Sequence, residues 1–197
     1  MVKEIVSKEN PILRKIATEV SISDIESPKI QTILADMKET LHAQEDGVAL
    51  AAPQIGVSLR IFVVSPRVET LLPKKKKALD GKIKKNVEHF VYINPVLTKL
   101  SHEKHDLEEG CLSARYLYGK IKRSLKATVT AYDEDGKKFT RGGSGILAQI
   151  FQHETDHLNG ILFLDSAYDV EDIPPENVKA KRELLAEARK KLSNESR

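Results

Sequence analysis

The segment 146–158 constrains the fold more strongly than any other part of this chain of 197 residues. It reads ILAQIFQHETDHL, and its apolar residues recur at helical spacing until Asn159 and Gly160 end the pattern. His153 and His157 are four residues apart, so a helix places both imidazoles on one face, about one turn from each other. That face continues the apolar stripe, which predicts that the two histidines point into the interior.

The same five residues, His153-Glu-Thr-Asp-His157, form an HExxH motif. In this motif two imidazoles can share one metal ion, and the glutamate is placed to accept a proton from a water molecule bound to that ion. A surface helix with accidentally spaced charges is the alternative interpretation. The apolar periodicity argues against it, because buried histidines beside a glutamate need a partner, and a metal ion supplies one.

A hydrolytic metal site needs a third protein ligand and one open position. No histidine follows His157, so a downstream ligand would have to be a carboxylate such as Glu176, as in a zinc endopeptidase. The competing candidate is Cys111, which follows a glycine and the two carboxylates Glu108 and Glu109. These carboxylates are candidates for orienting a ligand. A lone cysteine is usually an inert small apolar residue, so both alternatives remain open on the spacing alone.

The remaining hydrophobic pattern predicts further helices and strands. One helix is expected after Ser27-Pro28, and a polar helix is expected from about 176 to 192. The segment 47–56 is small, apolar and contains proline, which predicts a closely packed loop. Strands are expected at 59–64, 90–97, 127–132 with a return through 137–140, and 161–164. The strands cluster between helices rather than alternating with them, so an α+β fold is favoured over a parallel α/β sheet.

Composition and charge exclude several classes of protein. Hydrophobic residues make up 40% and charged residues 31% of the chain, which argues against disorder and against a membrane protein. One cysteine cannot form an internal disulfide, and the N-terminal segment lacks an apolar signal core, so we expect a cytoplasmic protein. The formal net charge of +3 is concentrated in residues 73–85, which carry seven lysines and one aspartate. A solvated loop is the simplest interpretation of that segment.

Three segments, in order along the chain, resemble the motifs of peptide deformylases. They are Gly47-Val-Ala-Leu-Ala-Ala-Pro-Gln-Ile-Gly56, Glu109-Gly-Cys-Leu-Ser113 and Gln152-His-Glu-Thr-Asp-His157. The resemblance implies an α+β fold in which antiparallel sheets pack around a central helix that carries HExxH, with a C-terminal helix. We therefore expect a single catalytic domain over 1–168, with 73–85 as an inserted lysine-rich surface loop, and a helical extension over 169–197.

The resemblance also implies a reaction and a metal site. Cys111, His153 and His157 would bind one divalent metal ion, commonly Fe(II) and replaceable by Ni or Zn. Glu154 would act as general base and then general acid. The reaction would remove the N-formyl group from nascent polypeptides that begin with formyl-methionine, releasing formate. The alternatives are the zinc endopeptidase, with Glu176 as a ligand, and a catalytically inactive metal-binding relative.

Other residues would contact the reacting group or the substrate. By the same resemblance, Gln54 and the backbone N–H of Leu112 would hold the oxyanion. Ala49 departs from the glycine usual in the first motif, and Arg115 follows Ser113 closely where the family often has a proline nearby. The candidate substrate-binding residues are Val48, Ala49, Gly110, Ile146 and Ile150, the two isoleucines as walls of a methionine pocket.

The basic segments suggest a macromolecular partner. The lysine-rich loop and the basic residues of the last helix are candidates for contact with the ribosome, where nascent chains emerge. No stretch has the 18 or more apolar residues that a membrane-spanning helix needs. We therefore expect no membrane association.

Overall fold

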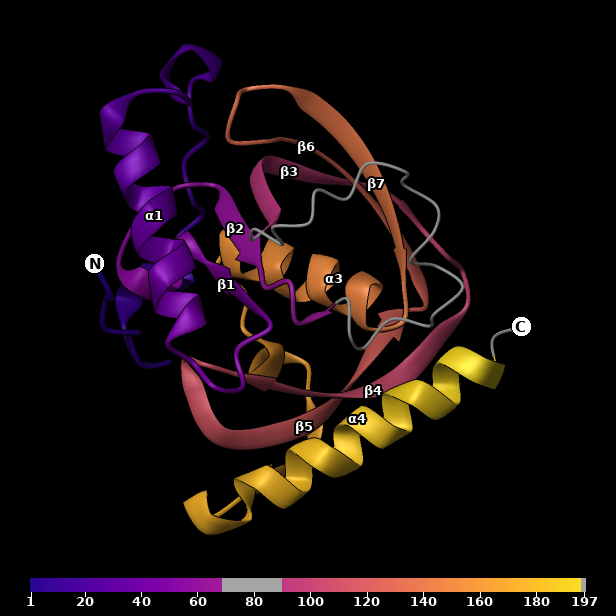
Figure 1. Ribbon diagram of the computed structural model, residues 1–197. Coiled ribbons are helices and arrows are strands. Elements are labelled where there is room, and N and C mark those ends of the chain that lie inside the picture. The colour runs from indigo at the N-terminus through magenta and orange to yellow at the C-terminus, as the bar shows by residue number, and fades with distance from the viewer. Residues whose placement is uncertain (69–89, 196–197) are drawn as a thin grey trace.

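The computed structural model describes residues 1–68 and 90–195, and the lysine-rich segment 73–85 lies outside them. Within these residues, two antiparallel sheets surround helix α3 (Ile146–Leu158), as Figure 1 shows. The first sheet has the order β1 (Ala49–Ala51), β2 (Ile61–Val64), β3 (Phe90–Leu100), β6 (Lys126–Tyr132), β7 (Lys138–Ser144). The second has the order β4 (Lys104–Cys111), β5 (Ala114–Ser124), β8 (Tyr168–Asp172). The α+β fold class is confirmed.

The first sheet is covered on both faces, and β2 shows how the sequence produces this. Successive side chains of a strand point to opposite faces. Phe62 and Val64 join the cluster around α3, whereas Ile61 and Val63 join a second cluster with α1 (Pro28–His42). A strand that is buried on both sides explains the continuous apolar run in the sequence.

Helix α3 is held in the interior by aromatic packing. Phe151 meets the ring of Tyr92 edge-on, with centroids 5.4 Å apart, and Tyr92 stacks on Phe62 at 4.5 Å. The helix begins after Gly145, whose φ of 59° is favourable only for glycine, and it ends before Gly160, with φ 75°. These contacts fix the rotation of α3, and with it the direction of its histidines.

Several expected elements differ from those observed. Residues 47–56 are not all loop, because Ala49–Ala51 pairs with β2 as a short strand. The strand expected at 161–164 is wrong: residues 163–165 form a 3-10 turn, in which Asp165 accepts a hydrogen bond from the backbone N–H of Leu162 at 2.9 Å. Strand β3 is central in its sheet, and Pro95 lies at a register shift between Ile93 and Val96.

The end of the described chain packs against the second sheet. Strand β8 pairs with β5, and helix α4 (Val178–Glu195) then runs beside β4 and β5 at the surface (Figure 1). In the described part of the chain, no helix is long and apolar enough to cross a membrane.

Candidate metal centre

Three potential metal ligands meet between β4 and α3. Cys111 ends β4, and His153 and His157 project from successive turns of α3. One ligand atom from each lies within 4.8 Å of the others, and Sγ of Cys111 is 3.2 Å from Nε2 of His157. Among the described residues this is the group whose geometry suits a metal ion, whereas Glu176 is exposed in the turn that precedes α4.

The turn after β4 explains why glycine precedes the cysteine. Gly110 pairs with Tyr118 of β5, and a Cβ at position 110 would lie 2.7 Å from the tyrosine ring. A larger residue there would displace the ring of Tyr118. The register then shifts between Gly110 and Cys111, so the cysteine leaves the regular ladder at the point where it faces α3.

A buried ion-pair network orients the first histidine. Oε2 of Glu109 is 2.9 Å from Nδ1 of His153, and Arg123 donates to both carboxylate oxygens of Glu109 at 2.8 and 3.0 Å. Arg123 also donates to Asp156 at 2.6 Å. Burial alone would raise the pKa of Glu109, but the hydrogen bonds from His153 and Arg123 lower it to about 2. Because Nδ1 bonds the carboxylate, Nε2 is left as the ligand atom.

The charges around the three ligands suit a cation. Burial acts to raise the pKa of Cys111, but the charge of His157 and hydrogen bonds from both histidines hold it well below its ordinary value. Burial acts to lower the pKa of His153, but Cys111 and Glu109 hold it well above its usual range. The site therefore stabilises a thiolate beside positive charge. A divalent ion would supply that charge in place of the imidazolium proton, so the donor set fits a metal.

Glu154 is buried beside these ligands, and among the described residues one of its carboxylate oxygens lacks a hydrogen bond that would offset the cost of burial. Within the described part of the chain, neither its Oε2 nor Nδ1 of His157 has a hydrogen-bond partner. Burial is the main cause that raises the pKa of Glu154 to about 7. A carboxyl group with a pKa near neutrality can both accept and donate a proton.

Gln54 directs its amide toward the same place. Its Oε1 accepts a hydrogen bond from the backbone N–H of Ala51 at 2.8 Å. This contact turns Nε2 toward Ser113 Oγ at 3.2 Å and Cys111 Sγ at 3.5 Å. The amide is thereby held as a hydrogen-bond donor beside the candidate metal ligands.

These side chains line a cavity of about 330 Å³. Its size falls within the range of small-molecule sites, about 300–1,000 Å³. Of the catalytic, metal-ligating and substrate-binding residues that the resemblance implies, all but His157 contribute to its wall; the others are Val48, Ala49, Gln54, Gly110, Cys111, Leu112, Ile146, Ile150, His153 and Glu154. His157 contacts Cys111 and is buried.

Other important residues carry no signal in the sequence. Arg123 and Tyr118 lie in β5, a strand that we did not expect, and their contacts with β4 depend on the pairing of these two strands. Val178 and Leu185 of α4 line the cavity as well. In the sequence they are two apolar residues of a polar helix, and nothing distinguishes them from exposed neighbours.

The geometry agrees with comparisons to known proteins. A family model described as polypeptide deformylase matches residues 2–172. The chain belongs to the peptide deformylase family. Members are metal-dependent hydrolases that remove the N-formyl group from nascent peptides, so the function expected from the sequence is confirmed at this level, and the endopeptidase alternative is not favoured.

Similar relatives include plant and bacterial deformylases. The chain is 40% identical over 162 residues to peptide deformylase 1A, chloroplastic/mitochondrial, of Arabidopsis thaliana, covering 82% of this chain and 60% of that relative. It is 38% identical over 163 residues to peptide deformylase 2 of Clostridium acetobutylicum, covering 83% of this chain and 93% of the relative. The chain thus spans about three fifths of the plant protein and nearly all of the clostridial one.

Solved structures show the same fold. A class I type b peptide deformylase from Acinetobacter baumannii superposes with a TM-score of 0.71 at 30% identity, covering 84% of this chain and 99% of that one. Another structure of the Acinetobacter protein, with Met-Ala-Ser bound, gives a TM-score of 0.70 at 30% identity over 84% of this chain and 98% of that one.

Proposed function

We propose that this chain removes the formyl group from peptides that begin with formyl-methionine, with Cys111, His153 and His157 holding one divalent metal ion. The observation that carries this proposal is that five side chains come together at one place, and four of them line one cavity. The three ligands lie together, Glu154 is buried beside them with an unpartnered oxygen, and the amide of Gln54 points toward Cys111.

Fe(II) is the metal that we propose, with Ni or Zn able to replace it. A thiolate and two imidazoles suit each of these first-row ions. When bound, such an ion would lower the pKa of a water molecule and polarise the formyl carbonyl. The network of Glu109 and Arg123 would keep His153 in the tautomer that presents Nε2.

The remaining steps are carried out by groups of the protein itself. Glu154 accepts a proton as the water oxygen attacks the formyl carbon. Gln54 Nε2 and the backbone N–H of Leu112 donate to the oxyanion that forms. Glu154 then returns the proton to the amine nitrogen as the carbon–nitrogen bond breaks, which yields formate and a free N-terminus. Each of these roles requires a group that faces the cavity, and all three residues line it.

The protein offers two strand edges that can bind the substrate peptide. Within the described residues, β1 and β4 are end strands of their sheets, and both line the cavity through Ala49 and Gly110. Unpaired backbone groups of an edge strand can bind an extended peptide. Ile146 and Ile150 of α3 would then form an apolar wall for the methionine side chain.

The test combines metal analysis with product analysis. Protein purified without oxygen should contain one metal ion per chain and release formate from a short formyl-Met peptide. Metal without formate would indicate an inactive relative, and cleavage of internal peptide bonds would indicate an endopeptidase. For Fe(II), activity should decay in air and persist after nickel substitution. An iron form that is stable in air would contradict the choice of metal.

We also propose that the enzyme works in the cytoplasm and meets its substrate at the ribosome. The lysine-rich segment 73–85 supports this by its charge, since lysines bind RNA phosphates in a salt-dependent manner. Replacing Lys74–Lys77 with serine should weaken binding to ribosomes at low salt while hydrolysis of a short peptide stays within about twofold, because none of the motif residues lies in this segment. Equal ribosome binding by both proteins would contradict this partner.

A further inference from the structure

The C-terminal helix α4 contributes two buried apolar side chains to the cavity that holds the metal ligands. Val178 is 5% exposed and Leu185 is 8% exposed, and both line the cavity. The neighbouring Leu184 is 64% exposed. The family model ends at residue 172, so this part of the wall lies outside the segment that matches the family.

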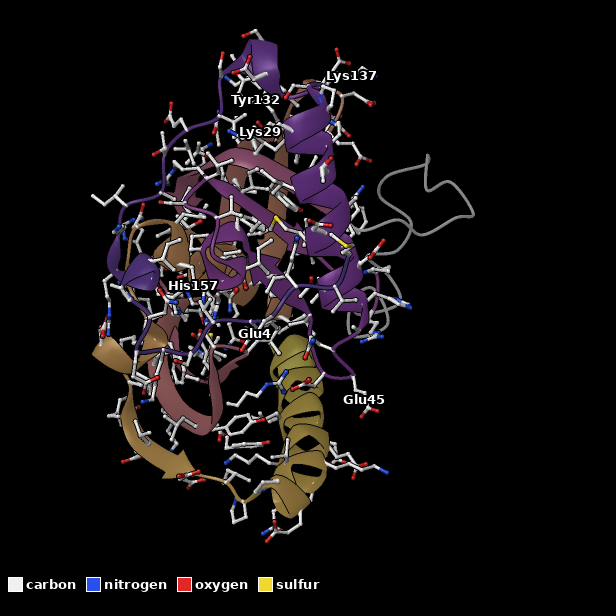
Figure 2. All side chains as sticks on the ribbon, turned by 90° about the vertical axis from the view of Figure 1, so that its left-hand side faces the viewer. Glu4, Lys29, Glu45, Tyr132, Lys137 and His157 are labelled. Carbon is white, nitrogen blue, oxygen red and sulfur yellow. The ribbon has the colours of Figure 1, made fainter. Side chains whose placement is uncertain are left out.

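One face of α4 is anchored toward β4 and β5. Lys181 lies between the two apolar residues at helical spacing, so all three share a face. Its ammonium group forms ion pairs with Glu108 of β4 and with Glu171 of β8, the latter at 2.9 Å. It also lies 6.0 Å from the ring centre of Tyr118, another residue of the cavity wall. Figure 2 shows the helix along the lower part of the molecule, near Glu45, which lines the same cavity.

The position of Glu108 in β4 gives the distance between the ion pair of Lys181 and the metal ligand Cys111. Glu108 stands three residues before Cys111 in β4. A strand rises about 3.3 Å per residue, so Glu108 lies about 10 Å from the metal ligand. An extended peptide has the same rise. A peptide that extends along β4 toward Glu108, with its formyl group at the metal site, would therefore place its second and third residues beside α4.

We propose that Val178 and Leu185 form a subsite for an apolar side chain at the second or third residue of the substrate. The inference rests on the proposed deformylation and adds a specificity determinant to it. The subsite selects apolar side chains because its wall is apolar. Contact with such a side chain removes more of this surface from water than contact with glycine. The anchoring ion pairs of Lys181 keep this wall in place.

The test compares two adjacent leucines of α4 on two peptides. We expect Leu185→Ala to lower kcat/KM for formyl-Met-Leu-Leu by about tenfold, mainly through KM, since truncation of an apolar pocket costs at least this much. Activity on formyl-Met-Gly-Gly should stay within about twofold. Leu184→Ala, the matched control, should change neither value. Leu185→Met conserves volume and should retain the preference for leucine.

If Leu185→Ala only loosened the packing of α4, it would lower thermal stability. It would not change the ratio of kcat/KM for formyl-Met-Leu-Leu to kcat/KM for formyl-Met-Gly-Gly. If Leu185→Ala and Leu184→Ala show the same ratio as the wild type, the subsite does not exist. If Leu185→Ala does not fold, Val178→Ala is the smaller truncation that carries the same comparison, and an unchanged ratio there would equally overturn the proposal. Failure of the proposed function is distinct, because the wild type would then release formate from neither peptide.

Discussion

The two ends of the cavity are built in different ways. At the inner end, beside the metal ligands, Glu109 contacts His153, Arg123 and Gln149, so its carboxylate is fixed by three partners. At the outer end, α4 is held by the ion pairs of Lys181 and by a few apolar contacts. Tyr116, with a φ of 71°, is exposed nearby and lines the same cavity.

Because of this difference, we expect residues at the inner end to govern the reaction and residues at the outer end to govern substrate preference. A substitution at the inner end leaves a buried charge or donor without its partner, which is costly. A substitution at the outer end removes apolar contact area and leaves the reacting groups in place. We therefore expect inner substitutions to abolish metal binding, stability or turnover, and outer substitutions to shift substrate preference.

The largest effect is expected from Cys111→Ala. It removes one of three ligands, so metal affinity should fall by more than the about 10- to 100-fold typical of losing a residue that only orients a ligand. Glu176→Ala, a change at an exposed carboxylate, should leave metal content and turnover intact. Metal analysis and formate release on both variants check this. The reverse pattern would move the site to a downstream carboxylate.

Arg123→Ala should destabilise the fold, because it leaves Glu109 buried without its cation. Breaking a buried ion pair costs about 3–5 kcal/mol of unfolding free energy. Lys120→Ala is a matched control on the same strand, since it removes only an exposed pair with Asp169 and should leave the free energy of unfolding nearly unchanged. Urea unfolding of the metal-loaded proteins measures both. An equal loss of unfolding free energy in both variants would mean that the buried ion pair of Arg123 stabilises the fold no more than an exposed pair does.

Gln54→Glu tests the oxyanion donor. The carboxylate keeps an oxygen to accept from the N–H of Ala51 but loses the donating amide. Loss of one such donor lowers kcat by about 10²–10³. Steady-state kinetics on a short formyl-Met peptide should show this loss with a smaller change in KM. An unchanged kcat would remove Gln54 from this role.

The smallest effect is expected from Ala49→Gly, which places the usual family residue at the cavity edge of β1. Glycine in a strand lowers stability by about 0.5–1 kcal/mol through backbone entropy. The side chains that carry out the reaction are untouched, so kcat should stay the same while KM shifts slightly. A large loss of kcat here would show that the edge of β1 takes part in the chemistry.

The sequence was most informative where one local rule dominates. Helix α3 has the expected bounds, 146–158, because its apolar spacing is regular and glycines stand at both ends. Strands β4 and β5 were missed because Glu108, Glu109 and other charged residues interrupt any alternation. These strands are stabilised by pairing with each other and by the contacts of Arg123. Such contacts depend on the assembled fold.

In the candidate site, too, some residues could be predicted from the sequence and others could not. The HExxH spacing alone indicated His153, Glu154 and His157, whereas Cys111, Gln54 and Leu112 were named through the resemblance of three short motifs to a known family. The contribution of α4 could not be predicted, since Leu184 and Leu185 are equivalent in the sequence. The ion pairs of Lys181 with β4 and β8 help to fix which face of α4 turns toward the cavity, and Leu185 lies on that face.

The most direct test of the metal and proton-transfer assignment is Glu154→Gln, measured for metal content and formate release beside the wild type. The change removes the proton acceptor but none of the three ligands. The variant should therefore retain one metal ion per chain and lose at least about a hundredfold in rate. Turnover near that of the wild type, with the metal in place, would contradict the role of Glu154 and the mechanism built on it.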